Sequence, residues 1–185
     1  MRESVTSTHD SKKPTRLKTS GTPGLAPMMV VFVPMDQSSF ARWREVSVRD
    51  YAADRVIAGY DDEGRSVENA EKQLKVILPD GLKTRGHFLC SISDRQTAQR
   101  VGIIWYGETP TREDTIFIYD IHIDEGLRGR GYGKAALMLV EEKAKELGKT
   151  KIALQVFGHN DRARRLYEEL GYKTTSTMMA KDLDR

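Results

Sequence analysis

The hydrophobic and polar residues of the first eighty positions predict one strand followed by two helices. A short β-branched run closed by Pro34 is typical of a strand. Apolar residues at helical spacing then predict a helix over residues 36–58 and, after a break at glycine, a second helix over 66–78. Ser66 with Asn69 could cap the second helix.

The middle of the chain alternates apolar and polar residues, as strands do when they bury one face. The alternation predicts three strands, near residues 87–93, 100–107 and 115–123. Because the connections between them are short, we expect an antiparallel meander.

The C-terminal third returns to helical spacing and predicts helices over residues 131–147 and 160–170, the second capped by Asn160. Further strands are expected at 151–156 and, last in the chain, at 172–180. The expected order is strand, two helices, three strands, helix, strand, helix, strand. Two strands joined by a single crossover helix lie parallel, so the sheet should be mixed and the fold class α/β.

The composition fits one globular domain preceded by a tail. Of the 185 residues, 38% are hydrophobic and 31% are charged. Residues 1–28 carry five Lys or Arg against two Asp or Glu, whereas residues 29–185 carry 25 of each, so the net charge of +3 lies in the leader. The leader is rich in Ser, Thr, Pro and Gly and is predicted to be disordered. The neutral body argues against nucleic acid as a partner of the domain.

Cysteine usage and hydropathy narrow the protein class further. The single cysteine, Cys90, cannot form an internal disulfide, and no cluster of Cys and His has the spacing of a zinc site. No apolar run approaches the roughly 18 to 20 residues of a membrane-spanning helix, and the N-terminus lacks the apolar segment of a signal peptide. We therefore expect a cytoplasmic protein with no metal and no membrane partner.

The segment most informative about function is a glycine-rich stretch at residues 121–134, between a predicted strand and a predicted helix. Glycines let the backbone approach a bound group and present successive N–H donors, and the following helix adds the positive end of its dipole. Arg128, Arg130 and Lys134 add positive charge around the same point. The arrangement suits a pyrophosphate.

Two common phosphate-binding loops do not match these residues. A Walker loop needs Ser or Thr after its Gly-Lys pair, and here Lys134 is followed by Ala135. The dinucleotide fingerprint needs G-x-G-x-x-G, whereas Gly129, Gly131 and Gly133 are spaced two apart. A tight turn that binds nothing is the alternative for the loop taken alone.

Two segments together resemble the signatures of the GNAT superfamily of N-acetyltransferases. Arg128-x-x-Gly131-x-Gly133 is similar to the acetyl-CoA-binding signature, and Asn160-x-x-Ala163-x-x-Leu166-Tyr167-x-x-x-Gly171-Tyr172 is similar to the second signature. The stretches FIYD at 117–120 and HN at 159–160 resemble small uncharacterised bacterial members. The resemblance implies a three-layer fold, in which helices flank a mixed, mostly antiparallel sheet that is splayed between its fourth and fifth strands.

The resemblance also implies direct transfer of an acetyl group from acetyl-CoA to a primary amine of a small molecule or a protein. Tyr167 would protonate the departing thiolate, for which a phenol of pKa near 10 is suited, and an ordinary apolar-face aromatic is its alternative. Asn160 could be a helix cap, a cofactor contact or both. The residues expected to bind acetyl-CoA are Ile121, His122, Ile123, Arg128, Gly129, Arg130, Gly131, Tyr132, Gly133, Lys134, Asn160, Ala163 and Tyr167.

The general base is the least determined part of the predicted site. Many relatives have a glutamate four residues before the position of Ile123, where this chain has Tyr119. Asp120 and His122 are the catalytic candidates, with a chain of waters as the third possibility. Strict alternation along the strand would place both on the face opposite Tyr119, and a bulge could turn either inward.

The acceptor amine should enter from the N-terminal half, because relatives build that side from the first two helices and the second-signature region. Acidic side chains there could attract a cationic amine or could be solvated surface: Glu45, Asp50, Asp54, Asp61, Asp62 and Glu63. Two other functions stay open, a non-catalytic acyl-CoA-binding module on the same scaffold and a nucleic-acid-binding protein that uses the basic leader. We expect a monomer or a homodimer.

Overall fold

The computed structural model describes residues 29–181 and 183, and the predicted leader at 1–28 lies outside the described residues. Its elements in chain order are β1 (Val30–Pro34), α1 (Gln37–Ile57), α2 (Glu63–Ile77), η1 (Gly81–Lys83), β2 (His87–Asp94), β3 (Arg100–Thr109), β4 (Arg112–Ile123), η2 (Glu125–Leu127), α3 (Tyr132–Glu146), β5 (Lys151–Leu154) and α4 (Asp161–Glu169).

The five strands form one open sheet in the order β1-β2-β3-β4-β5. The first four strands are antiparallel neighbours, and β5 lies parallel to β4. Helix α3 makes the crossover between these two parallel strands. The meander of β2, β3 and β4 and the mixed sheet are therefore as the sequence predicts.

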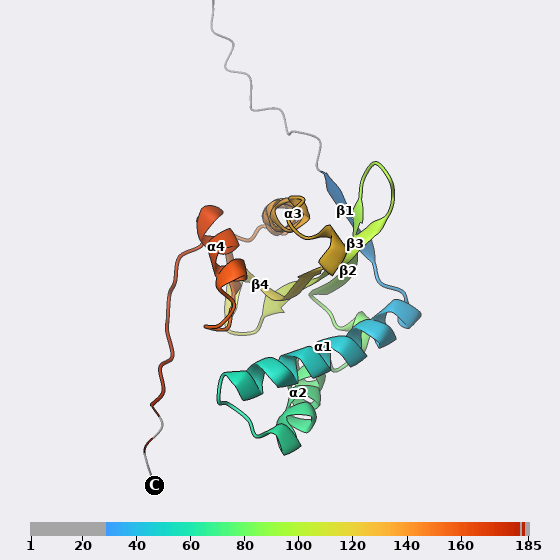
Figure 1. The fold of residues 1–185 in the computed structure, drawn as a ribbon. Helices are drawn as coiled ribbons and strands as arrows, with labels where there is room; N and C mark the ends of the chain where they lie inside the picture. Colours follow the sequence, from blue (N-terminus) through green and yellow to red (C-terminus); the bar gives the residue numbers. More distant parts are fainter. Residues whose placement is uncertain (1–28, 182, 184–185) are drawn as a thin grey trace, which may run out of the picture.

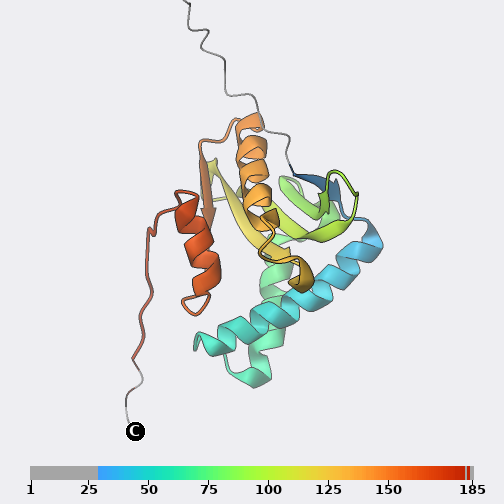
Figure 2. The ribbon, with the colours of Figure 1, turned by 45° about the horizontal axis from the view of Figure 1, so that its top comes forward.

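Helices cover both faces of the sheet. Figures 1 and 2 show α3 and α4 next to each other on one face and α1 and α2 on the other. Alternate residues of the strands supply two buried clusters. The cluster under α3 and α4 includes Ile104, Ile116 and Leu137. The cluster under α1 and α2 includes Trp43, Ile103 and Trp105. Two core layers on one sheet confirm the predicted three-layer α/β fold.

Strand β4 carries a bulge at Tyr119. Asp120 lies opposite Trp105 on β3, whereas Ile118 lies opposite the very next residue of β3, so Tyr119 has no partner of its own. Tyr119 and Trp105 both pack in the cluster under α1 and α2. Tyr119 and Asp120 therefore share a face, so strict alternation does not hold here and the bulge that the sequence left open is present.

The sheet splays between its two parallel strands. Strand β5 pairs with β4 only from Thr115 to Ile118, and β4 continues as far as Ile123. Beyond Ile118 no strand within the described residues pairs with β4 on that side. The predicted opening between the fourth and fifth strands is present.

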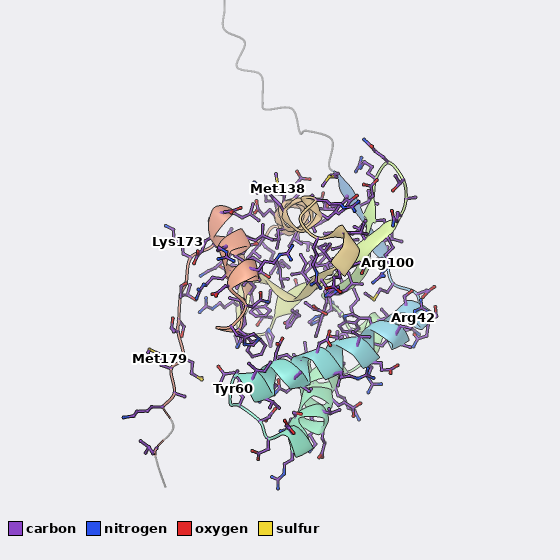
Figure 3. All side chains as sticks on the ribbon, viewed as in Figure 1. Arg42, Tyr60, Arg100, Met138, Lys173 and Met179 are labelled. Carbon is purple, nitrogen blue, oxygen red and sulfur yellow. The ribbon has the colours of Figure 1, made fainter. Side chains whose placement is uncertain are left out.

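The predicted last strand at 172–180 is wrong. These residues form no strand, and Met178 and Met179 are 75% and 90% exposed. Figure 3 shows Lys173 and Met179 on a segment that runs away from the sheet past α4. A strand is stabilised mainly by its partners and its buried face. This segment pairs with no strand among the described residues, and Tyr172 is its one residue that is not exposed.

The predicted caps of α2 are also wrong. The helix begins at Glu63, so Asp62 occupies the capping position, and its side chain makes no capping hydrogen bond. Ser66 lies inside the helix and donates to the carbonyl oxygen of Glu63, and Asn69 donates to Asp61. Both side chains satisfy local acceptors that hydrophobic periodicity does not reveal.

Candidate functional site

The end of β4 exposes backbone groups toward the gap left by β5. The N–H of Asp124 donates to β3, and the carbonyl oxygen of His122 also lies against β3. Because backbone groups alternate along a strand, those of Ile121 and Ile123 face the other way, where β5 has already ended. Arg128 Nε donates to the Ile123 carbonyl oxygen at 2.9 Å, and the two N–H groups remain as donors.

The glycine-rich turn joins this strand end to the N-terminus of α3. Gly129 and Gly131 have φ values of 80° and 87°, a left-handed backbone that favours glycine. Gly131 is the capping residue of α3, and no side chain caps the helix. The backbone N–H groups of Tyr132, Gly133 and Lys134 lie in the first turn, which has no acceptors inside the helix. The turn therefore gathers N–H donors beside the open edge of β4.

Three cationic side chains surround the turn, as the sequence predicts. Arg130 donates to the carbonyl oxygen of Gly126 at 3.2 Å, which ties it to the loop, as Arg128 is tied to β4. Arg128, Arg130 and Lys134 are exposed, and none forms an ion pair with a residue that the structure describes. Uncompensated positive charge at a helix N-terminus suits an anion such as phosphate.

Two residues of the first turn of α3 lie against neighbouring elements. The hydroxyl of Tyr132 donates to Asp94 Oδ2 at 2.9 Å, so its side chain anchors the helix to the β2–β3 turn. At Gly133 a Cβ atom would lie 3.4 Å from Leu166 of α4 and 3.7 Å from Ile123. Gly133 therefore lies where α3, α4 and the end of β4 meet, and an added Cβ atom would make ordinary van der Waals contacts there. Backbone groups, and not the Tyr132 hydroxyl, are the binding candidates at these two positions.

Helix α4 contributes the predicted cap and the predicted acid. Asn160 Oδ1 accepts from the N–H of Ala163 at 3.1 Å, which confirms its capping role. Tyr167 is half-buried against the cluster under α3, and its hydroxyl makes no hydrogen bond to a described residue. Burial raises the pKa of Tyr167, and the nearby charge of Asp120 raises it further. The phenol therefore stays protonated and able to donate.

Asp120 is held by α1. Its Oδ2 atom accepts from Trp43 Nε1 at 2.8 Å and from Ser47 Oγ at 3.2 Å. Burial raises the pKa of Asp120 and the negative charge of Asp50 adds to the rise, whereas the two hydrogen bonds and His122 act in the opposite direction. A carboxyl group whose pKa lies above its usual range is a candidate for proton transfer near neutral pH.

The other two residues of this strand face have different environments. His122 lies opposite Ile103 and so shares the face of Asp120, and it is exposed. Tyr119 stacks on Trp105 with ring centroids 4.4 Å apart, and its hydroxyl donates to the carbonyl oxygen of Glu108 at 3.0 Å. Tyr119 is thereby committed to the core, whereas Asp120 and His122 stay candidates for the general base.

The acidic residues of the N-terminal half do not act as one group. Asp61 pairs with Arg55, and their side chains are only 7% and 17% exposed. Asp54 contacts His159 Nε2 at 2.9 Å, which links α1 to the loop between β5 and α4. Asp50 is the member that acts electrostatically on the Asp120 carboxyl.

Glu45 lies elsewhere. It pairs with Arg49 four residues along α1, and both line a hollow of about 330 Å³ between α1 and α2. A second hollow of about 590 Å³ borders the same two helices near Phe40 and Pro79. Asp120, Tyr167 and the glycine turn line neither of these hollows.

The family is decided by a match that spans both predicted signatures. Residues 44–172 match the model of the Acetyltransferase (GNAT) family. The chain belongs to this family. Members of the GNAT family are acetyltransferases that use acetyl-CoA, so the resemblance read from the two signatures is confirmed.

Two relatives from Bacillus subtilis match this GNAT chain over most of their length. The uncharacterised N-acetyltransferase YdgE is 32% identical over 150 residues, which is 80% of this chain and 95% of that protein. The uncharacterised N-acetyltransferase YycN is 32% identical over 157 residues, 84% of this chain and 100% of that protein. The crystal structure of YycN superposes with a TM-score of 0.79 over 84% of this chain and 99% of that chain.

A more distant solved structure shares the fold. The structure of AAC(6')-Iy in complex with the bisubstrate analogue CoA-S-monomethyl-acetylneamine has a TM-score of 0.53 and 14% identity, covering 84% of this chain and 99% of that chain. At that identity the likeness concerns the fold alone.

Metal-binding and membrane-spanning features are absent from the described residues of this GNAT chain. No group of three or more His, Cys, Asp or Glu side chains among them could hold a metal ion. None of the described helices is both long and apolar enough to cross a membrane.

Proposed function

We propose that this chain is an N-acetyltransferase that moves the acetyl group of acetyl-CoA to a primary amine of a small molecule or a protein, with both substrates bound together. The observation that carries the proposal is the unpaired end of β4 beside the N-terminus of α3. Ile121 and Ile123 present N–H donors there, and the glycine turn supplies further donors at one end of the same edge. An extended amide-bearing arm and a pyrophosphate need this pair of features.

The donor set fits acetyl-CoA. Arg128, Arg130 and Lys134 would hold its phosphates, together with the N–H groups of the first turn of α3. The N–H groups of Ile121 and Ile123 would hold the arm and orient the thioester carbonyl. Acetyl-CoA supplies the activated acetyl group, and the chain has to position it and move the protons.

Two side chains would carry out the proton transfers in this proposal. Asp120 removes a proton from the attacking nitrogen, because its carboxyl lies on the α1 side of β4 and burial raises its pKa. The Tyr167 hydroxyl donates a proton to the departing thiolate, because burial keeps it protonated. An N–H bond and the C–S bond break, a C–N bond and an S–H bond form, and solvent returns the proton from Asp120 to Tyr167.

The test is acetyl transfer itself. Release of free CoA thiol is measured with a panel of mono- and polyamines, amino acids and lysine peptides, and mass spectrometry identifies the acetylated product. Arg128→Ala should raise the KM for acetyl-CoA, while Arg42→Ala, which removes an exposed arginine near the start of α1 (Figure 3), should leave it unchanged.

A second reading of the same scaffold is a non-catalytic acyl-CoA-binding module. The observation in its favour is Tyr119, which stands at the position of the glutamate in many relatives and is committed to Trp105 and Glu108. Tight CoA binding without turnover for any amine would favour this module over the enzyme. A protein that binds no CoA would contradict both.

A further inference from the structure

The hydrogen bonds from described residues to the Asp120 side chain involve only one of its two carboxyl oxygen atoms. We propose that Trp43 and Ser47 of α1 are positioning residues, which hold Oδ2 of Asp120 and leave Oδ1 to accept the proton from the acceptor nitrogen. This assignment deepens the proposed function and rests on it.

The geometry distinguishes the two carboxyl oxygens. Trp43 Nε1 and Ser47 Oγ both donate to Oδ2, at 2.8 Å and 3.2 Å. No hydrogen bond from the described residues reaches Oδ1. A carboxylate has acceptor capacity on both oxygens, so one anchored oxygen fixes the direction in which the other faces. In the proposed step an N–H bond of the amine breaks and an O–H bond forms at Oδ1.

The indole that holds Oδ2 is itself fixed. Trp43 is 6% exposed, and its ring lies edge-on to Trp105 with centroids 5.5 Å apart and beside Phe40 at 5.6 Å. Ser47 follows Trp43 by four residues, so both lie on the same face of α1. An indole N–H can only donate, which makes the carboxyl the acceptor in this contact. The helix thereby supplies two donors at a fixed place above β4.

The charges that face Asp120 come from three elements besides its two donors. Asp50 of α1 raises its pKa, His122 of β4 lowers it, and the Tyr167 phenol of α4 is close enough for its own pKa to be raised by Asp120. Burial is the largest effect and also raises the pKa of Asp120. Loss of the indole donor would remove one of the interactions that lower the pKa of Asp120, so the carboxyl would hold its proton to higher pH.

The chain offers a matched control for this donor. Trp105 lies in the same cluster, is 5% exposed, and donates its indole N–H to His87 Nδ1 at 3.1 Å. Trp43→Phe and Trp105→Phe therefore each remove one buried indole donor from the same core. Only the first removes a donor to Asp120.

The first readout is the pH dependence of kcat. Trp43→Phe should move the acidic limb to higher pH and reduce kcat about tenfold at pH 6, the size expected for a hydrogen bond to a charged group, with the KM for acetyl-CoA unchanged. Ser47→Ala should move the limb in the same direction by less. Trp105→Phe should leave the limb in place. Equal behaviour of the two tryptophan variants would overturn the proposal.

The second readout needs no turnover. Carbon-13 NMR of the aspartate carboxyl groups follows the titration of Asp120, whose signal is the one absent in Asp120→Asn. Its midpoint should rise in Trp43→Phe and Ser47→Ala and stay unchanged in Trp105→Phe. An unmoved midpoint in both variants refutes the positioning role. A raised midpoint in a protein that acetylates no amine refutes the proposed function alone.

Discussion

Replacing Tyr167 by phenylalanine separates a proton donor from a packing residue. The ring of Tyr167 packs in the cluster under α3, 5.7 Å from the ring of Tyr172, and its hydroxyl makes no hydrogen bond to a described residue. The change keeps the packing and removes only the acid. Loss of a general acid costs about a hundredfold in kcat, or about 2.7 kcal/mol in the barrier. The KM for acetyl-CoA and the melting temperature should stay nearly unchanged.

Tyr172, whose ring packs beside that of Tyr167, supplies the matched control. Its hydroxyl is buried and has no hydrogen-bond partner among the described residues. Because a buried hydroxyl without a partner costs about 1 to 3 kcal/mol, Tyr172→Phe should stabilise the protein. Each 1 kcal/mol corresponds to a rise of roughly 2 to 4 °C in Tm for a domain of this size. Its kcat should match that of the wild type.

The assay is thiol release at saturating acetyl-CoA and amine, with thermal melts of the same preparations. The expected pattern is a slow Tyr167→Phe enzyme of normal stability and a normally active, more stable Tyr172→Phe enzyme. An undiminished kcat in Tyr167→Phe would exclude this hydroxyl as the acid. Equal losses of kcat in both variants would show that packing, and not proton donation, sets the rate.

Three further changes test other parts of the molecule. Asp120→Asn should lower kcat at least about a hundredfold. Burial raises the pKa of Asp120 in the folded protein above the pKa near 3.8 that it has when unfolded. The carboxyl therefore stabilises the fold at pH values below 3.8 and loses that contribution as the pH rises, so Asp120→Asn should melt at a higher temperature than the wild type at pH 8. The hydrogen bond from Arg55 lowers the pKa of Asp61. The pair therefore stabilises the fold above the pKa that Asp61 has when unfolded, and this stabilisation is lost as acid protonates the carboxyl. Arg55→Met should lower the Tm at pH 7, and the difference from the wild type should disappear towards pH 3. Gly131→Ala places a side chain at a φ of 87° and should cost about 1 to 2 kcal/mol in thermal or denaturant unfolding, with weaker CoA binding by calorimetry.

Elements stabilised by their own neighbours in sequence could be predicted. The spacing of apolar residues predicted α1, α3 and α4 to within one or two residues of their observed ends, and Asn160 caps α4 as expected. The prediction of a strand at 172–180 was wrong because a strand-like sequence is not sufficient to form a strand. A strand also needs a partner edge, and the sequence of one segment does not contain that information.

The candidate site could be predicted from the sequence only where its residues lie close together in the chain. The glycine turn and its cations follow one another in the chain, so their gathering at α3 could be predicted from the motif. The contact between Trp43 and Asp120 joins residues 77 positions apart, and Ser47 lies 73 positions away. No periodicity links such positions, and only the packing of α1 across the sheet brings them together.

The bulge at Tyr119 explains how β4 presents a carboxyl group although the glutamate of many relatives is absent. In a regular strand Tyr119 and Asp120 would face opposite layers. The unpaired residue turns Asp120 to the face of Tyr119, so the carboxyl comes to lie under α1 one position further along the chain. Tyr119 is then free to stack on Trp105 and to hold the bulge in place through Glu108. The tyrosine and the aspartate therefore act together, because without the bulge the aspartate would face the layer of α3 and α4, away from its two donors.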